Sequence, residues 1–299
     1  MRLKQHDANG LLGVTDVQAL QDVSARLATE AARELRRRHS YERIGFDSAI
    51  RGDLRVRTKT SPTDIVTVDD TDIEGLIRRR LEEERPGEPI VGEEIGGVLE
   101  SGGGLRWLID PIDGTTNYVY GIPSYAVSIA AQIDGQTVAG SVADVTRDVV
   151  YTAALGHGSN VQISSDFSMR LQCNELRLAA MALVGTGFGS SVQRRTRQGT
   201  LVGELLPQVR DIRHIGSAAL DLCMVATGQL DAQYEHGLSI WDWAAGILIA
   251  AEAGAWLHIP EPDTPSSAGE VVVVSAPGIA AELDSIFEKL GVFDPLPAP

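Results

Sequence analysis

The segment WLIDPIDGTTN (107–117) constrains the fold of this chain most, because it places two carboxylates at the end of an apolar run. The run LRWLI (105–109) predicts a buried strand. Pro111 has no N–H to give to a ladder, so we expect the strand to end there, with Asp110 and Asp113 at its carboxyl end. Sheets of the α/β kind bind ligands at that end, and hard divalent cations prefer carboxylate oxygens. The segment therefore predicts a cation site, with a capped turn that binds nothing as the alternative.

The composition is that of a globular protein. With 299 residues and 43% hydrophobic content, the chain can form one large domain or two packed halves. Lys and Arg number 26 against 41 Asp and Glu, and the formal net charge of −15 disfavours a nucleic-acid or anionic membrane partner. The short basic run RRTRQ (194–198) is typical of a solvated helix face.

The sequence gives no sign of an oxidising compartment or a membrane. Cys173 and Cys223 lack the spacing of a metal or redox motif. No apolar stretch reaches the length of about 18 residues that a spanning helix needs. The first ten residues lack the apolar core of a signal peptide, so we expect a cytoplasmic location.

Hydrophobic periodicity predicts helices, then a meander, then alternating strands and helices. We expect two early helices, one from Val17 to about His39 and one at about 70–84. Three strands at 125–133, 137–145 and 149–155, the first two joined by an Asp-Gly turn, predict an antiparallel meander. After about residue 180, strands alternate with helices near 192–206, 217–227 and 241–253, before a last strand and helix.

This change of pattern predicts two halves and an α+β fold class. Residues 1–168 would form an N-terminal α+β half, and residues 169–299 a C-terminal half of α/β character. The segment 156–168 is the expected divide. The tail DPLPAP (294–299) is expected to be disordered.

Three further acidic motifs lie at strand or helix ends and can join the same cluster: SPTDIVTVDD (61–70), VGEE (91–94) and WDWAAG (241–246). Together with DPIDGTTN (110–117), and in this order, they resemble the inositol monophosphatase family of magnesium-dependent, lithium-sensitive sugar phosphatases. The resemblance runs from about Lys59 to Gly278. It implies a layered αβαβα sandwich of the sugar phosphatase type, with the site between the halves. It also implies a homodimer.

Five carboxylates are candidates for this one site: Asp70, Glu93, Asp110, Asp113 and Asp242. Like charges brought close together raise one another's pKa and destabilise the fold unless cations offset them. The cluster contains neither Cys nor His, so Mg2+ fits it better than Zn2+.

Carried over residue by residue, the resemblance implies two or three Mg2+ ions, most of whose ligands come from the N-terminal half. It gives the first ion Glu93, Asp110 and the carbonyl of Ile112, the second ion Asp110, Asp113 and Asp242, and a third, weaker ion Asp70 through water. The implied reaction is direct attack of a metal-activated water on a phosphate monoester, because nothing in the cluster supplies a nucleophilic side chain. Glu93 and Thr115, backed by Asp70, would orient this water and accept its proton.

The resemblance also implies a set of substrate contacts: Asp113, Gly114, Thr115, Gly216, Ser217, Ala218 and Glu235. Two of these segments are expected helix starts, where backbone N–H groups bind anions. Glu235, in QYEHG, is the expected specificity residue, since a carboxylate there accepts hydrogen bonds from polyol hydroxyls.

A phosphorylated polyol, with myo-inositol 1-phosphate favoured, is therefore the expected substrate. The same motifs in related proteins also serve fructose 1,6-bisphosphate, histidinol phosphate and 3′-phosphoadenosine nucleotides. An alternative of another class is a regulatory binding protein in a transcription complex, as some bacterial relatives suggest. The five intact carboxylates and Thr115 favour the enzyme, because binding alone would not need them.

Overall fold

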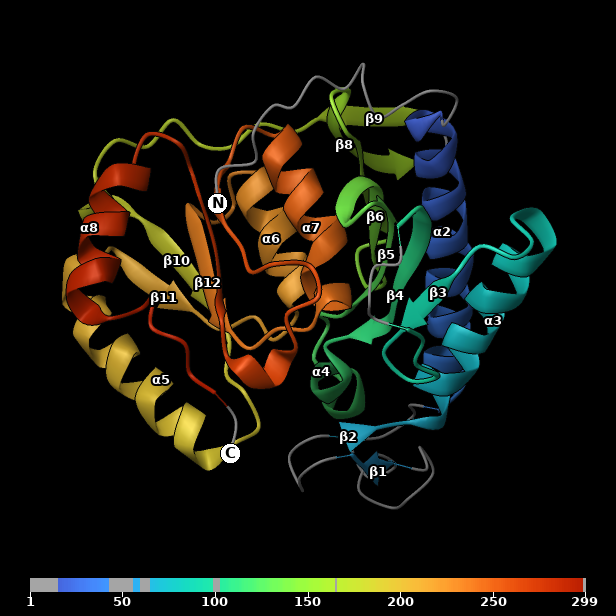
Figure 1. The fold of residues 1–299 in the computed structure, drawn as a ribbon, viewed down its shortest axis with the longest axis horizontal. Helices are drawn as coiled ribbons and strands as arrows, with labels where there is room; N and C mark the ends of the chain where they lie inside the picture. The colour runs from blue at the N-terminus through green and yellow to red at the C-terminus, as the bar shows by residue number, and fades with distance from the viewer. Residues whose placement is uncertain (1–15, 43–55, 60–64, 99–102, 165, 298–299) are drawn as a thin grey trace.

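Helices and sheets alternate in five layers in the part of the chain that the structure describes. The computed structural model describes residues 16–42, 56–59, 65–98, 103–164 and 166–297. Two outer helical layers enclose two sheets, and a central helical layer separates these sheets (Figure 1). The predicted αβαβα sandwich is confirmed. None of the described helices is long and apolar enough to cross a membrane.

The first sheet has seven strands, and they lie side by side in chain order. They are β3 (Ile90–Gly92), β4 (Leu105–Asp113), β5 (Ala126–Ile133), β6 (Gln136–Asp144), β7 (Val149–Ala154), β8 (Gly158–Ser164) and β9 (Phe167–Arg170). β3 and β4 run parallel, and all later neighbours run antiparallel. The predicted meander is confirmed as β5, β6 and β7.

The segment 156–168, expected as a divide, continues this sheet as β8 and the start of β9. Gly156 and Gly158 adopt φ values of +79° and +82°, which favour glycine, and they turn the chain back onto β7. The boundary between residues 168 and 169 falls inside β9. The division into two halves stays a prediction.

The second sheet has five strands, whose spatial order differs from chain order. In that order they are β11 (Asp211–Arg213), β10 (Leu183–Thr186), β12 (Ala232–His236), β14 (Val271–Ser275) and β13 (Trp256–His258). β11, β10 and β12 are parallel, and β14 is antiparallel to both of its neighbours. Parallel strands need crossover connections, so the α/β character expected after residue 180 is confirmed. A separate ribbon pairs β1 (Arg57–Thr58) with β2 (Ile65–Val66).

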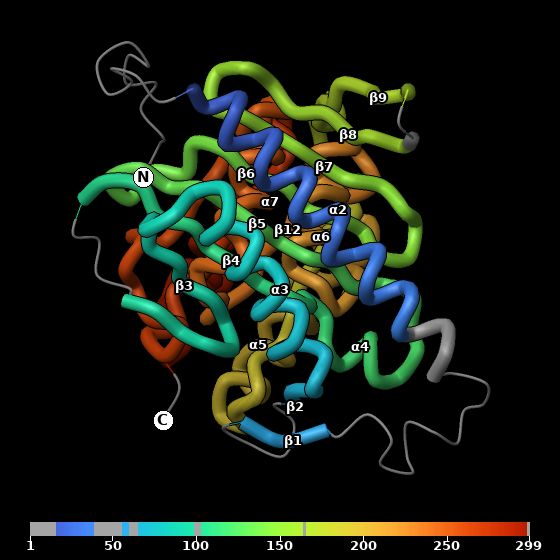
Figure 2. Tube along the Cα trace, turned by 90° about the vertical axis from the view of Figure 1, so that its right-hand side faces the viewer, coloured from blue at the N-terminus to red at the C-terminus, as the bar shows by residue number. Residues whose placement is uncertain are grey.

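Helices cover both sheets. α2 (Val17–Glu42) and α3 (Val68–Glu84) lie on the outer face of the seven-stranded sheet, and Figure 2 shows α2 crossing its strands obliquely. α6 (Ala218–Ala226) and α7 (Ile240–Glu252) lie between the sheets, and α5 (Val192–Leu205) and α8 (Ala280–Leu290) form the other outer layer (Figure 1). α4 (Thr115–Tyr120) follows β4 directly. Short 3-10 turns occupy Ala179–Met181, Leu206–Gln208 and Ser266–Ala268. The predicted helices are thus confirmed.

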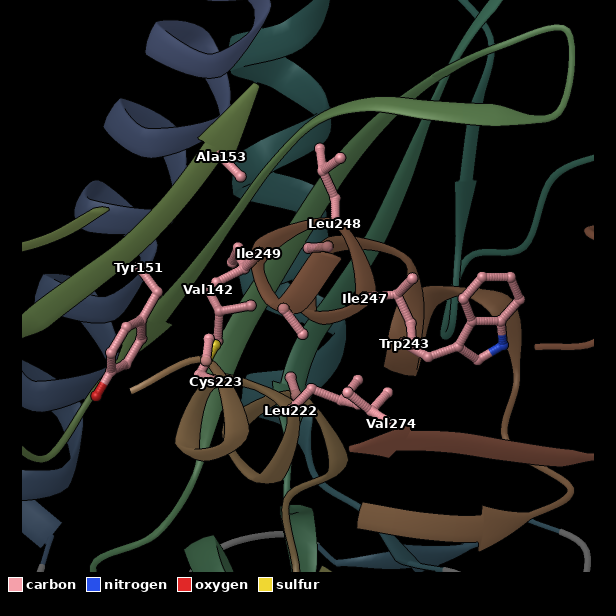
Figure 3. Packing of buried hydrophobic residues seen from close by; sticks show 14 of the residues in the cluster. Val142, Tyr151, Ala153, Leu222, Cys223, Trp243, Ile247, Leu248, Ile249 and Val274 are labelled. Atoms are coloured by element: carbon pink, nitrogen blue, oxygen red, sulfur yellow. The ribbon is translucent and has the colours of Figure 1, made fainter. Parts of the chain in front are cut away.

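Three hydrophobic cores fill the spaces between the layers, because side chains alternate between the two faces of each strand. On β4, Trp107 and Ile109 pack toward α2 and α3, whereas Leu108 packs toward α6 and α7. Figure 3 shows the central core, where Leu222 of α6 and Trp243 of α7 lie among strand side chains. α7 is buried over most of its length, as expected for an apolar helix between two sheets.

The C-terminal tail is held against the fold as far as residue 297, so its expected disorder is wrong for the described part. The N–H of Leu296 donates to the carbonyl of Gly269 at 2.8 Å. The carbonyl of Leu296 accepts a hydrogen bond from Nε of the buried Arg194 at 2.6 Å. The composition of the tail could not reveal that a guanidinium from α5 supplies this donor.

His236 should make the folded state less stable in acid. It is buried at the end of β12, and its Nε2 lies 2.8 Å from the carbonyl of Val292, so the neutral ring donates there. Burial lowers the pKa of His236 from 6.5 to about 4. The unfolded state therefore binds the proton first, and stability is lost as pH falls from 6.5 toward 4, by about 3 kcal/mol in total.

Urea unfolding at pH 7 and pH 5 checks this expectation. Wild type should lose about 2 kcal/mol more than His236→Gln over this interval, because glutamine keeps a donor but does not titrate. The variant also controls for the carboxylates, which both proteins share. Parallel stability profiles of the two proteins would contradict the assignment.

Candidate active site

A β-bulge turns Asp110 and Asp113 toward the same face of the sheet. Residues three apart on a regular strand point to opposite faces. Here Asp110 pairs with Ser128 and Asp113 with Ala126, so β4 has one residue more than β5 over this stretch. Pro111 lies in the bulge, where no regular ladder bond is needed. The prediction that the strand ends at Pro111 was therefore wrong, and β4 runs on to Asp113.

Asp113 joins β4 to the start of α6. Its Oδ2 accepts hydrogen bonds from Ser217 Oγ at 2.5 Å and from the N–H of Ala219 at 2.7 Å. Ser217 is also the N-cap of α6, because its Oγ accepts from the N–H of Leu220 at 3.3 Å. The expected substrate-binding turn at 216–218 thus lies against a carboxylate of the seven-stranded sheet.

Gly114 and Gly216 allow two turns to approach closely. Their φ values are +97° and +88°, a region that favours glycine. A Cβ on Gly114 would stand 3.0 Å from the carbonyl oxygen of Gly216. Asn117 joins the same turns by donating from Nδ2 to the carbonyl of Ile215 at 2.8 Å. The turns that begin α4 and α6 are therefore in direct contact.

Thr115 and Asp70 are in direct contact. Thr115 Oγ1 lies 3.1 Å from Asp70 Oδ1 and 3.0 Å from the carbonyl of Ile112, and its proton can go to either acceptor. Asp70 is the third residue of α3, and its Oδ2 accepts from the N–H of Thr67 at 2.7 Å in a capping box. Burial raises the pKa of Asp70 to about 6, although hydrogen bonds from Thr67 oppose the shift.

Glu93 and Glu94 follow β3, and both form a salt bridge with the ammonium group of Lys59. Nζ of Lys59 lies 2.9 Å from Glu93 Oε1 and 2.5 Å from Glu94 Oε1. Burial raises the pKa of Glu94 to about 7, although the hydrogen bond from Lys59 opposes this shift. The buried Glu74 of α3 accepts the N–H of Glu94 at 2.7 Å. Glu74 therefore holds the turn that carries Glu93 and Glu94, and Lys59 offsets part of the negative charge of these two residues.

Asp242 comes from the other half of the chain. It is the third residue of α7, and its Oδ2 accepts the N–H of Ser239 at 2.8 Å in a second capping box. Ser128 of β5 donates to the carbonyl of Trp241 at 3.2 Å, which ties the start of α7 to the seven-stranded sheet. The two helix starts that carry Asp70 and Asp242 thus face the bulge of β4.

The carboxylates repel one another. Burial, followed by the negative charge of Glu93, raises the pKa of Asp110 well above its usual range, and Asp113 and Asp242 add to the shift. Burial and Glu93 raise the pKa of Asp242 in the same way. Burial raises the pKa of Asp113 to about 6, even though Ser217 and Ala219 donate to it. The site therefore holds more negative charge than its own residues neutralise.

This donor set fits a hard divalent cation. Among the described residues, no three Asp, Glu, His or Cys side chains are positioned closely enough to hold a metal ion as they stand. Glu93, Asp113 and Asp242 nevertheless lie close enough to Asp110 for their charges to raise its pKa. Glu93 and Asp242 are partly exposed. Oxygen atoms alone, without thiolate or imidazole, suit Mg2+ better than Zn2+.

Glu235 lies beside the carboxylate cluster, near the carboxyl end of β12, the central strand of the second sheet. Its carboxylate lies over Gly187, where a Cβ would stand 2.1 Å from Glu235 Oε1. Burial, followed by the charge of Asp113, raises the pKa of Glu235 to about 8. The charge of Glu235 also contributes to the raised pKa of Asp242. The structure thus brings the predicted residues of both halves together, while their roles stay predictions.

Sequence reasoning missed three buried polar residues around the site. Glu74, Asp221 and Gln233 have exposed fractions of 0%, 1% and 1%. Asp221 interrupts the apolar run ALDLCMVA, and this was the one available signal. Glu74 lies in a largely polar helix segment, so the neighbouring residues do not indicate that its side chain is buried. Lys59 also lies at the site, where it contacts two glutamates.

Comparisons with known proteins show the family to which this chain belongs. The sequence profile of the inositol monophosphatase family matches residues 16–289. Inositol-1-monophosphatase of Mycobacterium bovis is 51% identical over 282 residues, which cover 93% of this chain and 96% of the relative. Nus factor SuhB of Pasteurella multocida is 37% identical over 205 residues, which cover 68% of this chain and 74% of the relative.

Solved structures share the fold. The structure of Mycobacterium tuberculosis SuhB matches with a TM-score of 0.78 and 46% identity, covering 94% of this chain and 100% of that chain. Relatives of this kind are generally metal-dependent phosphatases. The family match extends over the whole carboxylate cluster and over both sheets. The chain belongs to the inositol monophosphatase family and is a phosphoric monoester hydrolase.

Proposed function

We propose that this protein hydrolyses a phosphorylated polyol, with myo-inositol 1-phosphate as the favoured substrate, in a Mg2+-dependent reaction. The carboxylate cluster carries the proposal, because Asp110 and Asp113 of β4 and Asp242 of α7 lie close enough to repel one another. Relatives that share about half of the sequence are inositol-1-monophosphatases, which supports this substrate. Related phosphatases that act on fructose 1,6-bisphosphate, histidinol phosphate or 3′-phosphoadenosine nucleotides stay alternatives.

Two or three Mg2+ ions, held by Glu93, Asp110, Ile112, Asp113, Asp242 and Asp70, would supply positive charge for the phosphate and acidify an attacking water. The chain's own residues then move the proton. Thr115 Oγ1 can accept it while passing its own proton to Asp70 Oδ1, 3.1 Å away. Asp70 Oδ1 therefore lies at hydrogen-bond distance from the hydroxyl whose proton it would accept.

The glycine turns would seat the substrate. Gly114 and Thr115 begin α4, where their backbone N–H groups can donate to phosphate oxygens. Gly216, Ser217 and Ala218 begin α6 beside them, on the side of the polyol. Water adds to phosphorus, the bond from phosphorus to the polyol oxygen breaks, and this oxygen takes a proton from solvent water. The products are the free polyol and inorganic phosphate.

A substrate panel tests this function directly. The protein with Mg2+ is assayed with myo-inositol 1-phosphate and the three alternative phosphates at equal concentration, and kcat/KM values are compared. We expect the inositol ester to be hydrolysed most efficiently. A higher kcat/KM for another member of the panel would replace the substrate and keep the reaction.

Glu235→Gln should separate recognition from chemistry, because Glu235 is proposed to contact the polyol and not the metal ions. At a pH above the Glu235 pKa of about 8, where the carboxylate is ionised, loss of a charge-assisted hydrogen bond is worth roughly 1.5–3 kcal/mol, so kcat/KM for myo-inositol 1-phosphate should fall about ten- to a hundredfold. p-Nitrophenyl phosphate, which has no matching hydroxyls, should lose little. An equal loss for both substrates would place Glu235 in the catalytic machinery or the fold.

A second candidate function is a regulatory role in a transcription complex. Relatives named Nus factor SuhB favour this role. The intact carboxylate cluster favours the enzyme instead. Complementation of a deletion strain by Asp110→Asn would support the regulatory role, since this change is expected to remove catalysis.

The remaining expectations of the family resemblance stay predictions. They are inhibition by lithium, a homodimer and a cytoplasmic location. Each proposed ligand comes from one chain, so catalysis need not depend on the dimer.

A further inference from the structure

Gly185 of β10 and Gly187, which directly follows this strand, leave room for two polar side chains of β12. β10 and β12 are parallel, and Gly185 is paired with Gln233 in their register. A Cβ on Gly185 would stand 2.2 Å from Gln233 Oε1, and a Cβ on Gly187 would stand 2.1 Å from Glu235 Oε1. Gln233 and Glu235, two residues apart, share one face of β12. The glycines thus allow both side chains to lie flat against the neighbouring strand.

Gln233 contacts Glu235 within this space. Nε2 of Gln233 donates to Glu235 Oε2 at 3.3 Å. When Glu235 is ionised, the amide presents its nitrogen here, because an amide oxygen and a carboxylate oxygen would repel each other. The side chain of Gln233 is only 1% exposed, and its Oε1 has no hydrogen-bond partner among the described residues. Its contact with Glu235 is therefore the one polar contact that the described structure gives the Gln233 side chain.

We propose that Gln233 is a positioning residue for substrate recognition: its amide holds one carboxylate oxygen of Glu235 over Gly187 and leaves the other to accept a substrate hydroxyl. This inference rests on the proposed recognition of a polyol by Glu235. A carboxylate held in one orientation binds a hydroxyl at a smaller entropy cost than a mobile one. Gln233 therefore acts through Glu235 and touches neither the phosphate nor the metal ligands.

Gln233→Met tests the proposal, because methionine has a similar length and lacks the donor. We expect kcat/KM for myo-inositol 1-phosphate to fall about three- to tenfold, while that for p-nitrophenyl phosphate stays within about twofold. Gly185→Ala should produce the same selective loss, since its Cβ displaces the amide from the other strand. This second variant carries the test if Gln233→Met does not fold. Tyr234→Phe, on the opposite face of β12, is the matched control and should leave both values unchanged.

A double-mutant cycle distinguishes positioning from a general effect on the fold. In the Glu235→Gln background, Gln233→Met should have no further effect on the polyol phosphate, because the carboxylate that it positions is gone. Equal losses for both substrates, or additive losses in the cycle, would overturn the inference alone. If Glu235→Gln itself causes no selective loss, the proposed polyol recognition fails, and this inference fails with it.

Discussion

Removal of divalent cations by a chelator should abolish hydrolysis of phosphate monoesters. The buried carboxylates repel an incoming phosphate dianion, and within the described residues near them Lys59 pairs with glutamates and not with the substrate. A metal ion contributes several kcal/mol of charge stabilisation in such reactions, so the rate should fall by at least about a thousandfold. The measurement is kcat/KM with and without excess chelator, followed by titration of Mg2+ back into the assay.

Thermal unfolding provides a readout of metal binding that does not depend on activity. Mg2+ at a hundred times its dissociation constant should stabilise the protein by about 2.7 kcal/mol, because the unfolded chain does not assemble the cluster. KCl at matched ionic strength controls for simple charge screening. Full activity in excess chelator would refute the metal-dependent reaction, whatever the unfolding curve shows.

Replacing Asp110 with asparagine should have opposite effects on catalysis and on stability. Loss of a major electrostatic group costs about 3 kcal/mol or more of transition-state stabilisation, so kcat/KM should fall at least about a hundredfold. The metal-free protein should become more stable, because the raised pKa shows that the folded state disfavours the Asp110 carboxylate at neutral pH. Urea unfolding in chelator at pH 7 measures this gain.

Asp231→Asn is the matched control for that experiment. Asp231 is buried like Asp110, but it accepts the N–H of Leu183 at 2.8 Å and lies outside the cluster. Its replacement should lower stability and leave kcat/KM nearly unchanged. A loss of stability in Asp110→Asn, similar to that of the control, would show that the cluster is not electrostatically strained.

The two acidic residues of DPIDG illustrate how far the sequence could predict the site. Their spacing indicated a shared function, and the resemblance named their partners. The geometry that unites them is a bulge, which depends on the pairing of Asp110 with Ser128 and of Asp113 with Ala126. That pairing is set by another strand, so Pro111 alone could only suggest that β4 stops.

Buried polar residues could not be predicted for a related reason. Gln233 looks like an ordinary strand residue until Gly185 of β10 is placed beside it. Long periodic helices such as α2 and α7 were predictable because their apolar faces are local in sequence. Burial of a single polar side chain depends on residues far away in the sequence. The hydrophobic periodicity of the local segment does not indicate which residues these are.

The hydrogen bonds from Ser217 and Ala219 to Asp113 have a consequence for how the molecule unfolds. They connect a carboxylate of the seven-stranded sheet to a helix that precedes the last strands of the other sheet. Asp242 provides a second link: it belongs to α7, in the layer between the sheets, and it lies near Asp113 of β4. A cation bound among these groups would act as a crosslink, so the two sheets should melt as a single cooperative unit when it is present.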